Sequence, residues 1–296
     1  MPIRYIEPVY RPPSEARSLI LPVTDGCSWN RCAFCEMYTD PRKKFRARDE
    51  SEVLESIRRV GAHPAGRAAR RVFLADGDAL VLPTRRLLNV LLAIRAHLPQ
   101  THRVSAYCLP RNLRRKSVAE LGELADAGLK LVYVGAESGD DTVLARVGKG
   151  ETFASTREAL DKLGAAGIVR SVMILNGLGG VAFSAAHARH SADLANATQP
   201  EFLATLVVSF PGGEARFRAA FPDWEALDIS GLLLEMERFI DRLELRRTVF
   251  RSDHASNWLV LRGNLPRDKE TLLAQLRAAR AAPETAPLRP AWARGL

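Results

Sequence analysis

The sequence predicts an α/β fold, a partial (β/α)6 TIM-type barrel with a C-terminal helical and strand extension. Six short apolar runs with β-forming character alternate with longer amphipathic segments. This alternation predicts βαβ units and a parallel sheet. Polar or glycine-rich sequences follow several of the runs, which is where barrel folds build their sites. An open, doubly wound sheet would share the alternation, so the pattern alone leaves that alternative open.

The predicted elements follow the chain in a regular order. The strands are Ser18–Val23, Arg71–Ala75, Arg103–Cys108, Lys130–Gly135, Arg170–Asn176 and Phe202–Phe210. The helices between them are Glu52–Val60, Thr84–Leu98, Ser117–Ala127, Phe153–Ala166 and Ala182–Ala197. Apolar residues spaced three and four apart carry the helix predictions.

The pattern changes after Pro211-Gly212-Gly213, where the regular alternation stops. A long charged helix over Trp224–Leu245, a short strand at Thr248–Phe250 and a helix over Asp268–Ala281 are expected there. We therefore predict a core of residues 1–215, a C-terminal closing segment of residues 216–282 and a flexible tail of residues 283–296.

Composition narrows the classes of function. Apolar residues make up 47% of the 296 residues, enough for a full core. The absence of a long apolar run predicts no membrane span, and the polar start predicts no secretory signal. The net charge of +9 raises a nucleic-acid partner as a hypothesis, but aromatic residues are few and do not alternate with the basic ones, so it is not favoured.

Three of the four cysteines lie within nine residues, which is a poor pattern for a disulfide framework. Cys27, Cys32 and Cys35 follow the first predicted strand with the spacing C-x4-C-x2-C. Three thiolates on one loop can hold three irons of a [4Fe–4S] cubane and leave the fourth iron open. Clustered thiols also favour a reducing, cytoplasmic location.

Other interpretations of the cysteines compete. A zinc site would need a fourth ligand nearby, and the nearest histidine, His63, lacks ligand spacing. A dithiol redox pair would use Cys32 and Cys35 alone. Structural cysteines are a third interpretation, and Cys108, at the end of an apolar strand, is most simply a core residue.

The loop resembles that of the radical S-adenosylmethionine (SAM) superfamily, with Phe34 as the aromatic residue before the third cysteine. The commonest spacing there is C-x3-C-x2-C, so this chain has one extra residue between Cys27 and Cys32. The resemblance implies that a cluster with an open iron binds SAM and cleaves it to methionine and a 5′-deoxyadenosyl radical, with a flavodoxin- or ferredoxin-type electron donor.

Later strand ends supply candidate SAM contacts. Asp76-Gly77-Asp78, after the second strand, looks like a variant of the family's Gly-Gly-Glu, and an ordinary capped turn is the alternative. Val134-Gly135-Ala136-Glu137-Ser138-Gly139, with Lys149-Gly150, resembles the family pattern GxESGxxxxLxxxxKG, in which the carboxylate suits ribose hydroxyls. By analogy Ser171 is expected at the SAM carboxylate, and the turn containing Gly177 and Gly179 is expected near adenine.

Candidate catalytic residues lie elsewhere. Tyr107 ends the third strand and either lines the pocket or belongs to the core. His254 and Asn257, in a polar run that resembles the ending of an uncharacterised branch of the family, either act on the substrate or bond the barrel edge.

The sequence thus predicts a radical SAM enzyme with a [4Fe–4S] cluster and SAM as cofactors. Its substrate and specific reaction are not encoded in these motifs. The alternative is a non-catalytic iron–sulfur protein for electron transfer or sensing, in which the Glu137 motif would have no role.

Overall fold

The computed structural model describes residues 3–295 and divides into two compact units. The first unit comprises residues 1–30, 37–134 and 159–170, and the second comprises residues 31–36, 135–158 and 171–296. Strand β6 (Leu129–Glu137) and helix α6 (Phe153–Ala165) each contribute residues to both units.

Parallel strands form the centre of the first unit. Its sheet runs β1 (Leu19–Pro22), β4 (Arg71–Ala75), β5 (Arg103–Cys108) and β6, with every neighbouring pair parallel. Four consecutive residues of β4 are buried, as expected for a strand covered on both faces. A small antiparallel pair, β2 (Thr24–Asp25) and β3 (Arg46–Ala47), lies outside this sheet.

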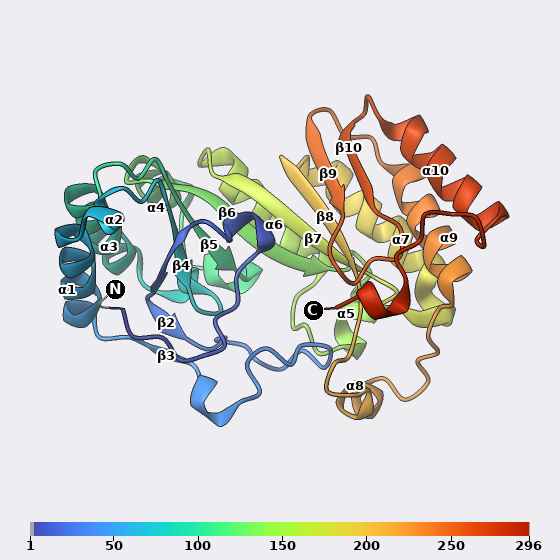
Figure 1. Cartoon of the computed structure of the whole chain (residues 1–296), viewed down its shortest axis with the longest axis horizontal. Helices are drawn as coiled ribbons and strands as arrows, with labels where there is room; N and C mark the ends of the chain where they lie inside the picture. The colour runs from blue at the N-terminus through green and yellow to red at the C-terminus, as the bar shows by residue number, and fades with distance from the viewer. Residues whose placement is uncertain (1–2, 296) are drawn as a thin grey trace. The chain divides into compact units, whose positions relative to one another are not determined.

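The helices of the first unit are α1 (Glu50–Ala62), α2 (Pro64–Arg67), α3 (Thr84–His97) and α4 (Val118–Asp126). Helix α3 packs against both α1 and α4 (Figure 1). It buries an apolar stripe at helical spacing, whereas Leu92 is exposed. Side-chain caps start two of these helices, Asp49 for α1 and the Ser117–Glu120 capping box for α4.

The second unit contains β7 (Val169–Asn176), β8 (Phe202–Val207) and β9 (Thr248–Ser252) in parallel, followed by antiparallel β10 (Leu261–Leu265). Its helices are α5 (Asp141–Arg146), α7 (Gly180–Thr198), α8 (Ala215–Ala220), α9 (Ile229–Arg242) and α10 (Lys269–Ala281). Helix α9 packs against both α7 and α10 (Figure 1) and buries Leu232, Leu233, Met236, Phe239 and Ile240.

These observations confirm the predicted α/β class. In both units the parallel strands follow one another in chain order, as in a barrel-type winding, and no reversal within either unit marks a doubly wound sheet. Helix α9 begins at Ile229, later than the predicted start at Trp224, because the Asp228 carboxylate caps it by accepting from the Gly231 amide. Strand β10 was not predicted from the sequence. It forms by pairing with β9, and its own sequence does not show that pairing.

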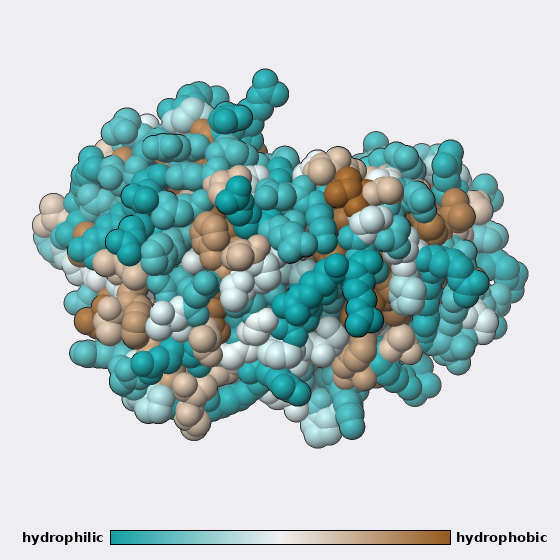
Figure 2. All heavy atoms as spheres, turned by 180° about the vertical axis from the view of Figure 1, so that it is seen from behind, coloured by the Kyte–Doolittle hydropathy of each residue, from teal (hydrophilic) through white to brown (hydrophobic). Residues whose placement is uncertain are grey.

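Polar side chains dominate the face shown in Figure 2, and hydrophobic residues form only small, separate patches there. The most exposed large hydrophobic side chain among the described residues is Trp292, at 87%. No helix between residues 3 and 295 has the length and apolar character needed to cross a bilayer.

The packing of the second unit predicts unequal effects of two matched substitutions. Phe250, in β9, is fully buried, whereas Phe202, in the neighbouring strand β8, is 38% exposed. We expect Phe250→Ala to lower the free energy of unfolding by about 3–5 kcal/mol and Phe202→Ala to lower it by less than about 1 kcal/mol. Urea denaturation followed by circular dichroism measures both, and equal losses would contradict this description of the core.

Candidate active site

The cysteine loop follows β1 and β2 and carries three half-buried thiols, none of which forms a disulfide. Gly26 precedes Cys27 with a φ of 67°, and a Cβ there would lie 2.0 Å from the Lys43 carbonyl oxygen, so only glycine fits. In the second unit, the Cys35 amide donates to the Cys32 carbonyl at 3.2 Å, which closes a tight turn between these two cysteines.

The donor set fits an iron–sulfur cluster better than a single ion. Thiolates are the usual ligands of such clusters, and three are available on one loop. Across residues 3–295, no three Cys, His, Asp or Glu side chains are gathered around one point as ligands of a single ion. A cubane cluster does not need its cysteine ligands to meet at one point, because each cysteine binds a different iron.

The β4 end supports the beginning of the cysteine loop. A Cβ on Gly77 would lie 1.9 Å from the Gly26 carbonyl oxygen and 2.8 Å from the Cα of Cys27, so the two turns are in close contact. The Asp78 carboxylate accepts from the amide and hydroxyl of Ser28 and from the Asn112 side chain. Burial raises the pKa of Asp78, against the lowering effect of these hydrogen bonds.

The Asp76 carboxylate is also engaged. It forms a buried ion pair with Lys43 and accepts from the Tyr38 hydroxyl at 3.1 Å. The Tyr38 hydroxyl in turn accepts from the Gly77 amide at 2.9 Å. Both carboxylates of the Asp76–Asp78 turn are therefore engaged by other side chains and amides of the protein. A SAM contact from this turn would have to come from its backbone.

Tyr107 lies in an aromatic group of the first unit. Its ring centre is 5.2 Å from that of Phe73 and 6.1 Å from that of Tyr133, both with edge-to-face geometry. This placement matches the core alternative for Tyr107, and its catalytic role stays a prediction.

The β6 end carries a buried carboxylate with one unused oxygen. Glu137 has a φ of 65°, which is uncommon for a residue with a side chain. Its Oε1 accepts from Lys149 Nζ at 3.0 Å, while its Oε2 is buried and has no hydrogen-bond partner among residues 3–295. A Cβ on Gly135 would lie 2.1 Å from Glu137 Oε1, so the missing side chain of Gly135 makes room for the carboxylate.

Lys149 connects Glu137 electrostatically with two of the cysteines. Burial by itself would lower the pKa of Lys149, but the Glu137 carboxylate, followed by the sulfur of Cys32 and then that of Cys35, raises it. The ammonium group also lies 6.0 Å from the centre of the Phe34 ring. Lys149 therefore stays positively charged between a carboxylate and the cysteine loop.

A buried polar network links the end of β6 to α7. The Ser138 hydroxyl accepts from the Asp140 amide at 2.9 Å and is hydrogen-bonded to His187 Nδ1 at 2.8 Å. The other ring nitrogen, His187 Nε2, is 3.8 Å from Glu235 Oε1.

Glu235, from α9, holds the turn at the β7 end. Its Oε1 accepts from the Asn176 side chain and from the Gly177 amide, both at 2.6 Å. Gly177 has a φ of 85°, and a Cβ there would approach Leu232 to 2.8 Å. Gly179 packs against Phe183 and His187. The buried Glu235 carboxylate thus fixes the turn that is predicted to contact adenine.

Ser171 is separated from this turn along the same strand. It is the third residue of β7, five residues before Asn176. At about 3.3 Å per residue, the two lie roughly 16 Å apart along the strand. The structure therefore does not bring Ser171 to the carboxyl end of β7, and its proposed SAM contact gains no support.

The loop between β9 and β10 contains His254 and Asn257. The side-chain oxygen of Asn257 accepts from the Val207 backbone amide at 2.8 Å, and its side-chain nitrogen donates to the Thr205 carbonyl at 2.9 Å. The side chain therefore bonds the end of β8 as a neighbouring strand would. Asn257 therefore bonds the sheet edge, one of the two alternatives predicted for it. His254 is half-buried in the same loop, and catalytic roles for both residues stay predictions.

Comparison with protein families identifies the fold. Residues 21–186, more than half of the chain, match the model of the Radical SAM superfamily. The chain belongs to the radical SAM superfamily. Its cofactors are accordingly a [4Fe–4S] cluster and SAM.

Solved structures agree on the fold of this radical SAM protein. Coproporphyrinogen III oxidase (HemN) from Escherichia coli, described as a radical SAM enzyme, is 15% identical with a TM-score of 0.56, covering 76% of this chain and 52% of that one. TsrM from Kitasatospora setae, a radical SAM methyltransferase, is 20% identical with a TM-score of 0.50, covering 63% and 35%. HydG, an [FeFe]-hydrogenase maturase, is 14% identical with a TM-score of 0.51, covering 77% and 50%.

This chain thus spans about half or less of the length of these three structures. At such low identity the similarity supports the fold alone. The search of curated proteins found no match for the radical SAM protein.

Sequence reasoning missed the residues that support the site from a distance. Lys43, Asn112 and Glu235 each contact a predicted motif but belong to no motif themselves. The sequence does contain one signal for Glu235, a charged residue among the apolar positions of an amphipathic helix, where it is 1% exposed.

The Glu235 contacts predict a large stability effect. Glu235→Ala would leave the Gly177 amide buried without its acceptor and the Asn176 side chain with its long 3.4 Å bond to the Leu232 carbonyl, which should cost about 2–4 kcal/mol of unfolding free energy. Glu237→Ala, in the same helix, removes ion pairs nearer the surface with Arg277 and Arg280 and should cost about 1 kcal/mol or less. Chemical denaturation compares the two variants, and a smaller loss for Glu235→Ala than for Glu237→Ala would refute the anchoring role.

Proposed function

We propose that this chain is a radical SAM enzyme that binds its cluster through Cys27, Cys32 and Cys35 and cleaves SAM. When bound, the cluster supplies the electron that splits SAM into methionine and a 5′-deoxyadenosyl radical, which removes hydrogen from the substrate. The observation that carries the proposal is the unused buried oxygen of Glu137 in the same unit as Cys32 and Cys35.

Glu137 is suited to recognise the ribose of SAM. A buried acceptor without a partner is costly, so a site that retains one favours a ligand that donates to it. The ribose diol offers two donors, and Lys149 already donates to the other oxygen of the Glu137 carboxylate. Lys149 also brings positive charge to the cysteine loop, which suits an anionic cluster.

The Asn176–Gly177 turn is proposed to hold adenine. Glu235 fixes the Asn176 side chain and the Gly177 amide, so this turn is held before any ligand arrives. Such preorganisation lowers the ordering cost of binding. A simple electron carrier or sensor would need neither this turn nor the Glu137 acceptor, and that alternative is not favoured.

Location, partners and segment boundaries also belong to the proposal. Cysteines that form no disulfide within residues 3–295, together with a reducible cluster, suit a cytoplasmic setting with a flavodoxin- or ferredoxin-type donor. We assign residues 216–282 to closure over the substrate and residues 283–296 to a tail. The basic composition keeps a nucleic-acid substrate as the less favoured choice.

Cysteine replacement tests the cluster assignment. We expect the triple variant Cys27→Ala/Cys32→Ala/Cys35→Ala to retain almost no iron or sulfide after anaerobic reconstitution and to form no 5′-deoxyadenosine from SAM under reducing conditions. Cys108→Ala is the matched control, because Cys108 is buried in β5 and its thiol contacts the Leu109 carbonyl. Wild-type iron content in the triple variant would contradict the proposal.

A pair of glycine substitutions tests the role of Glu137. Gly135→Ala places a methyl group against Glu137 Oε1, so it should weaken SAM binding about 10- to 100-fold by displacing the carboxylate. Gly122→Ala, in α4, meets nothing within 4 Å and should leave SAM affinity unchanged while raising stability by up to about 1 kcal/mol. Calorimetric titration with SAM reads both variants; unchanged affinity in Gly135→Ala, despite a shifted carboxylate, would remove Glu137 from the SAM site.

A further inference from the structure

The C-terminal tail is fastened to the loop between β9 and β10 by Arg289. One guanidinium nitrogen of Arg289, Nη1, donates to the carbonyls of His254 and Asn257, and Nη2 donates to the Asp253 carbonyl at 3.4 Å. The Arg289 amide adds a bond of 2.7 Å to the Trp258 carbonyl. The tail therefore follows the whole length of this loop.

Arg294 makes a second attachment a few residues later. Its Nε and Nη2 donate to the Ser256 carbonyl at 2.9 and 2.7 Å, and its guanidinium lies 3.8 Å from the centre of the Trp258 ring. The remaining nitrogen, Nη1, has no hydrogen-bond partner within residues 3–295. It is therefore available to a ligand.

The two arginines lie close enough to influence each other, and within residues 3–295 no carboxylate forms an ion pair with either of them. Their partners in the described part of the chain are carbonyl oxygens and an aromatic ring. The nearest acidic side chain on the loop, Asp253, is paired with Arg262 at 2.7 Å. Burial, followed by the charge of Arg289, lowers the pKa of Arg294. Two like charges held together in this way attract an anion.

His254 adds a neutral donor beside them. Its Nδ1 accepts from the Ser256 amide at 3.1 Å, so the imidazole proton belongs on Nε2. Burial, followed by the charge of Arg289, lowers the pKa of His254 and favours the neutral ring; Asp253 opposes this weakly. The ring therefore presents Nε2–H as a hydrogen-bond donor at neutral pH.

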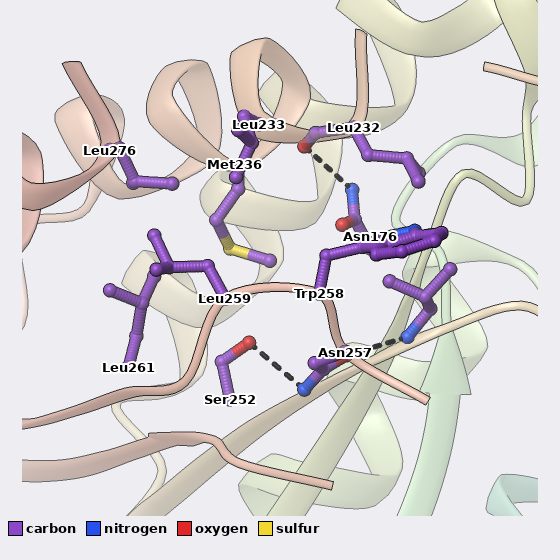
Figure 3. A pocket seen from close by; sticks show the side chains of 11 residues that line it. Asn176, Leu232, Leu233, Met236, Ser252, Asn257, Trp258, Leu259, Leu261 and Leu276 are labelled. Carbon is purple, nitrogen blue, oxygen red and sulfur yellow. Dashed lines mark hydrogen bonds between the residues drawn. The ribbon is translucent and has the colours of Figure 1, made fainter. Parts of the chain in front are cut away.

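The loop lies at the site-building edge of the second unit. It follows β9, which is parallel to β8, and Asn257 bonds the end of β8. Figure 3 shows the Trp258 ring beside Asn176 at a small cavity that Asn257 also lines. The guanidinium group of Arg294 lies over the same Trp258 ring. Neither arginine lines this cavity, but Trp258 connects Arg294 with the Asn176 end of the turn that we assign to adenine.

We propose that Arg289, Arg294 and the Nε2–H of His254 form an oxyanion-binding site for a carboxylate or phosphate group of the substrate. Nη1 of Arg294 and the neutral imidazole can each donate to an oxygen of such a group, and Arg289 adds positive charge nearby. That the anion belongs to the substrate rests on the proposed function, whereas the binding of an anion does not. The anionic group fixes one end of the substrate, and the reacting hydrogen lies on another part of it.

Anion titration of the holoprotein tests the site directly. The probes are inorganic phosphate and acetate, added at constant ionic strength against chloride, with the ring resonances of ¹³C-labelled histidine followed by NMR. His254→Asn identifies the His254 signal among the six histidines. We expect a saturable shift of the His254 signal by phosphate, acetate or both, and the stronger of the two identifies the group.

Substitutions of the arginines decide the outcome. Arg294→Met should weaken anion binding about tenfold or more, and Arg294→Lys, which keeps the positive charge but loses the planar guanidinium, should weaken it less. Arg267→Met is the control, because Arg267 is exposed and pairs only with the adjacent Asp268. If Arg294→Met fails to fold, the wild-type shift and the Arg294→Lys affinity still decide the question.

Two results would overturn the site: no saturable shift of the His254 signal with either anion, or wild-type affinity in folded Arg294→Met. Formation of 5′-deoxyadenosine from SAM is measured on the same preparation. A protein that cleaves SAM but binds no anion at His254 refutes this inference alone, and one that binds the anion but never cleaves SAM refutes only the proposed function.

Discussion

The strand-end loops of this protein depend on buried side chains that act as hydrogen-bond partners for their backbones. Asp78 accepts from the Ser28 amide in the cysteine loop, Glu235 from the Gly177 amide, and Asn257 pairs with the end of β8. Loops that leave the sheet lose the ladder partners that strands have, and unpaired buried backbone groups are costly. Each of these side chains satisfies that need and fixes the shape of a loop that a cofactor or substrate is proposed to contact.

Two groups of side chains in the second unit keep hydrogen-bonding capacity or charge that the protein itself does not use. Lys149 occupies one oxygen of Glu137 and leaves the other buried and unused. The arginines of the tail are bonded to carbonyl oxygens, which accept hydrogen bonds but carry no full negative charge. A neutral diol suits the first and an anion suits the second. In chemical terms, the second unit thus contains a candidate cofactor subsite and a candidate substrate subsite of different character.

Local sequence patterns predicted the fold class and the family, whereas support across long sequence separations could not be predicted. Strand β4 has the predicted bounds because its apolar run is complete in itself. Glu235 meets Gly177 58 residues earlier, and Arg289 meets His254 35 residues earlier, so neither leaves a periodic signal. The SAM contact of Ser171 was predicted by analogy with relatives, and this residue lies near the start of β7. The sequence of the strand alone did not show how far Ser171 is from the carboxyl end.

The central claim is that SAM is held at an open iron of a cluster bound by this chain. Electron–nuclear double resonance on the reduced holoprotein, with SAM labelled by ¹⁵N at the methionine amino group and ¹⁷O at the carboxylate, tests it most directly. The account predicts hyperfine coupling from both labels to the cluster spin. A reduced cluster that shows coupling from neither label under saturating SAM would contradict it.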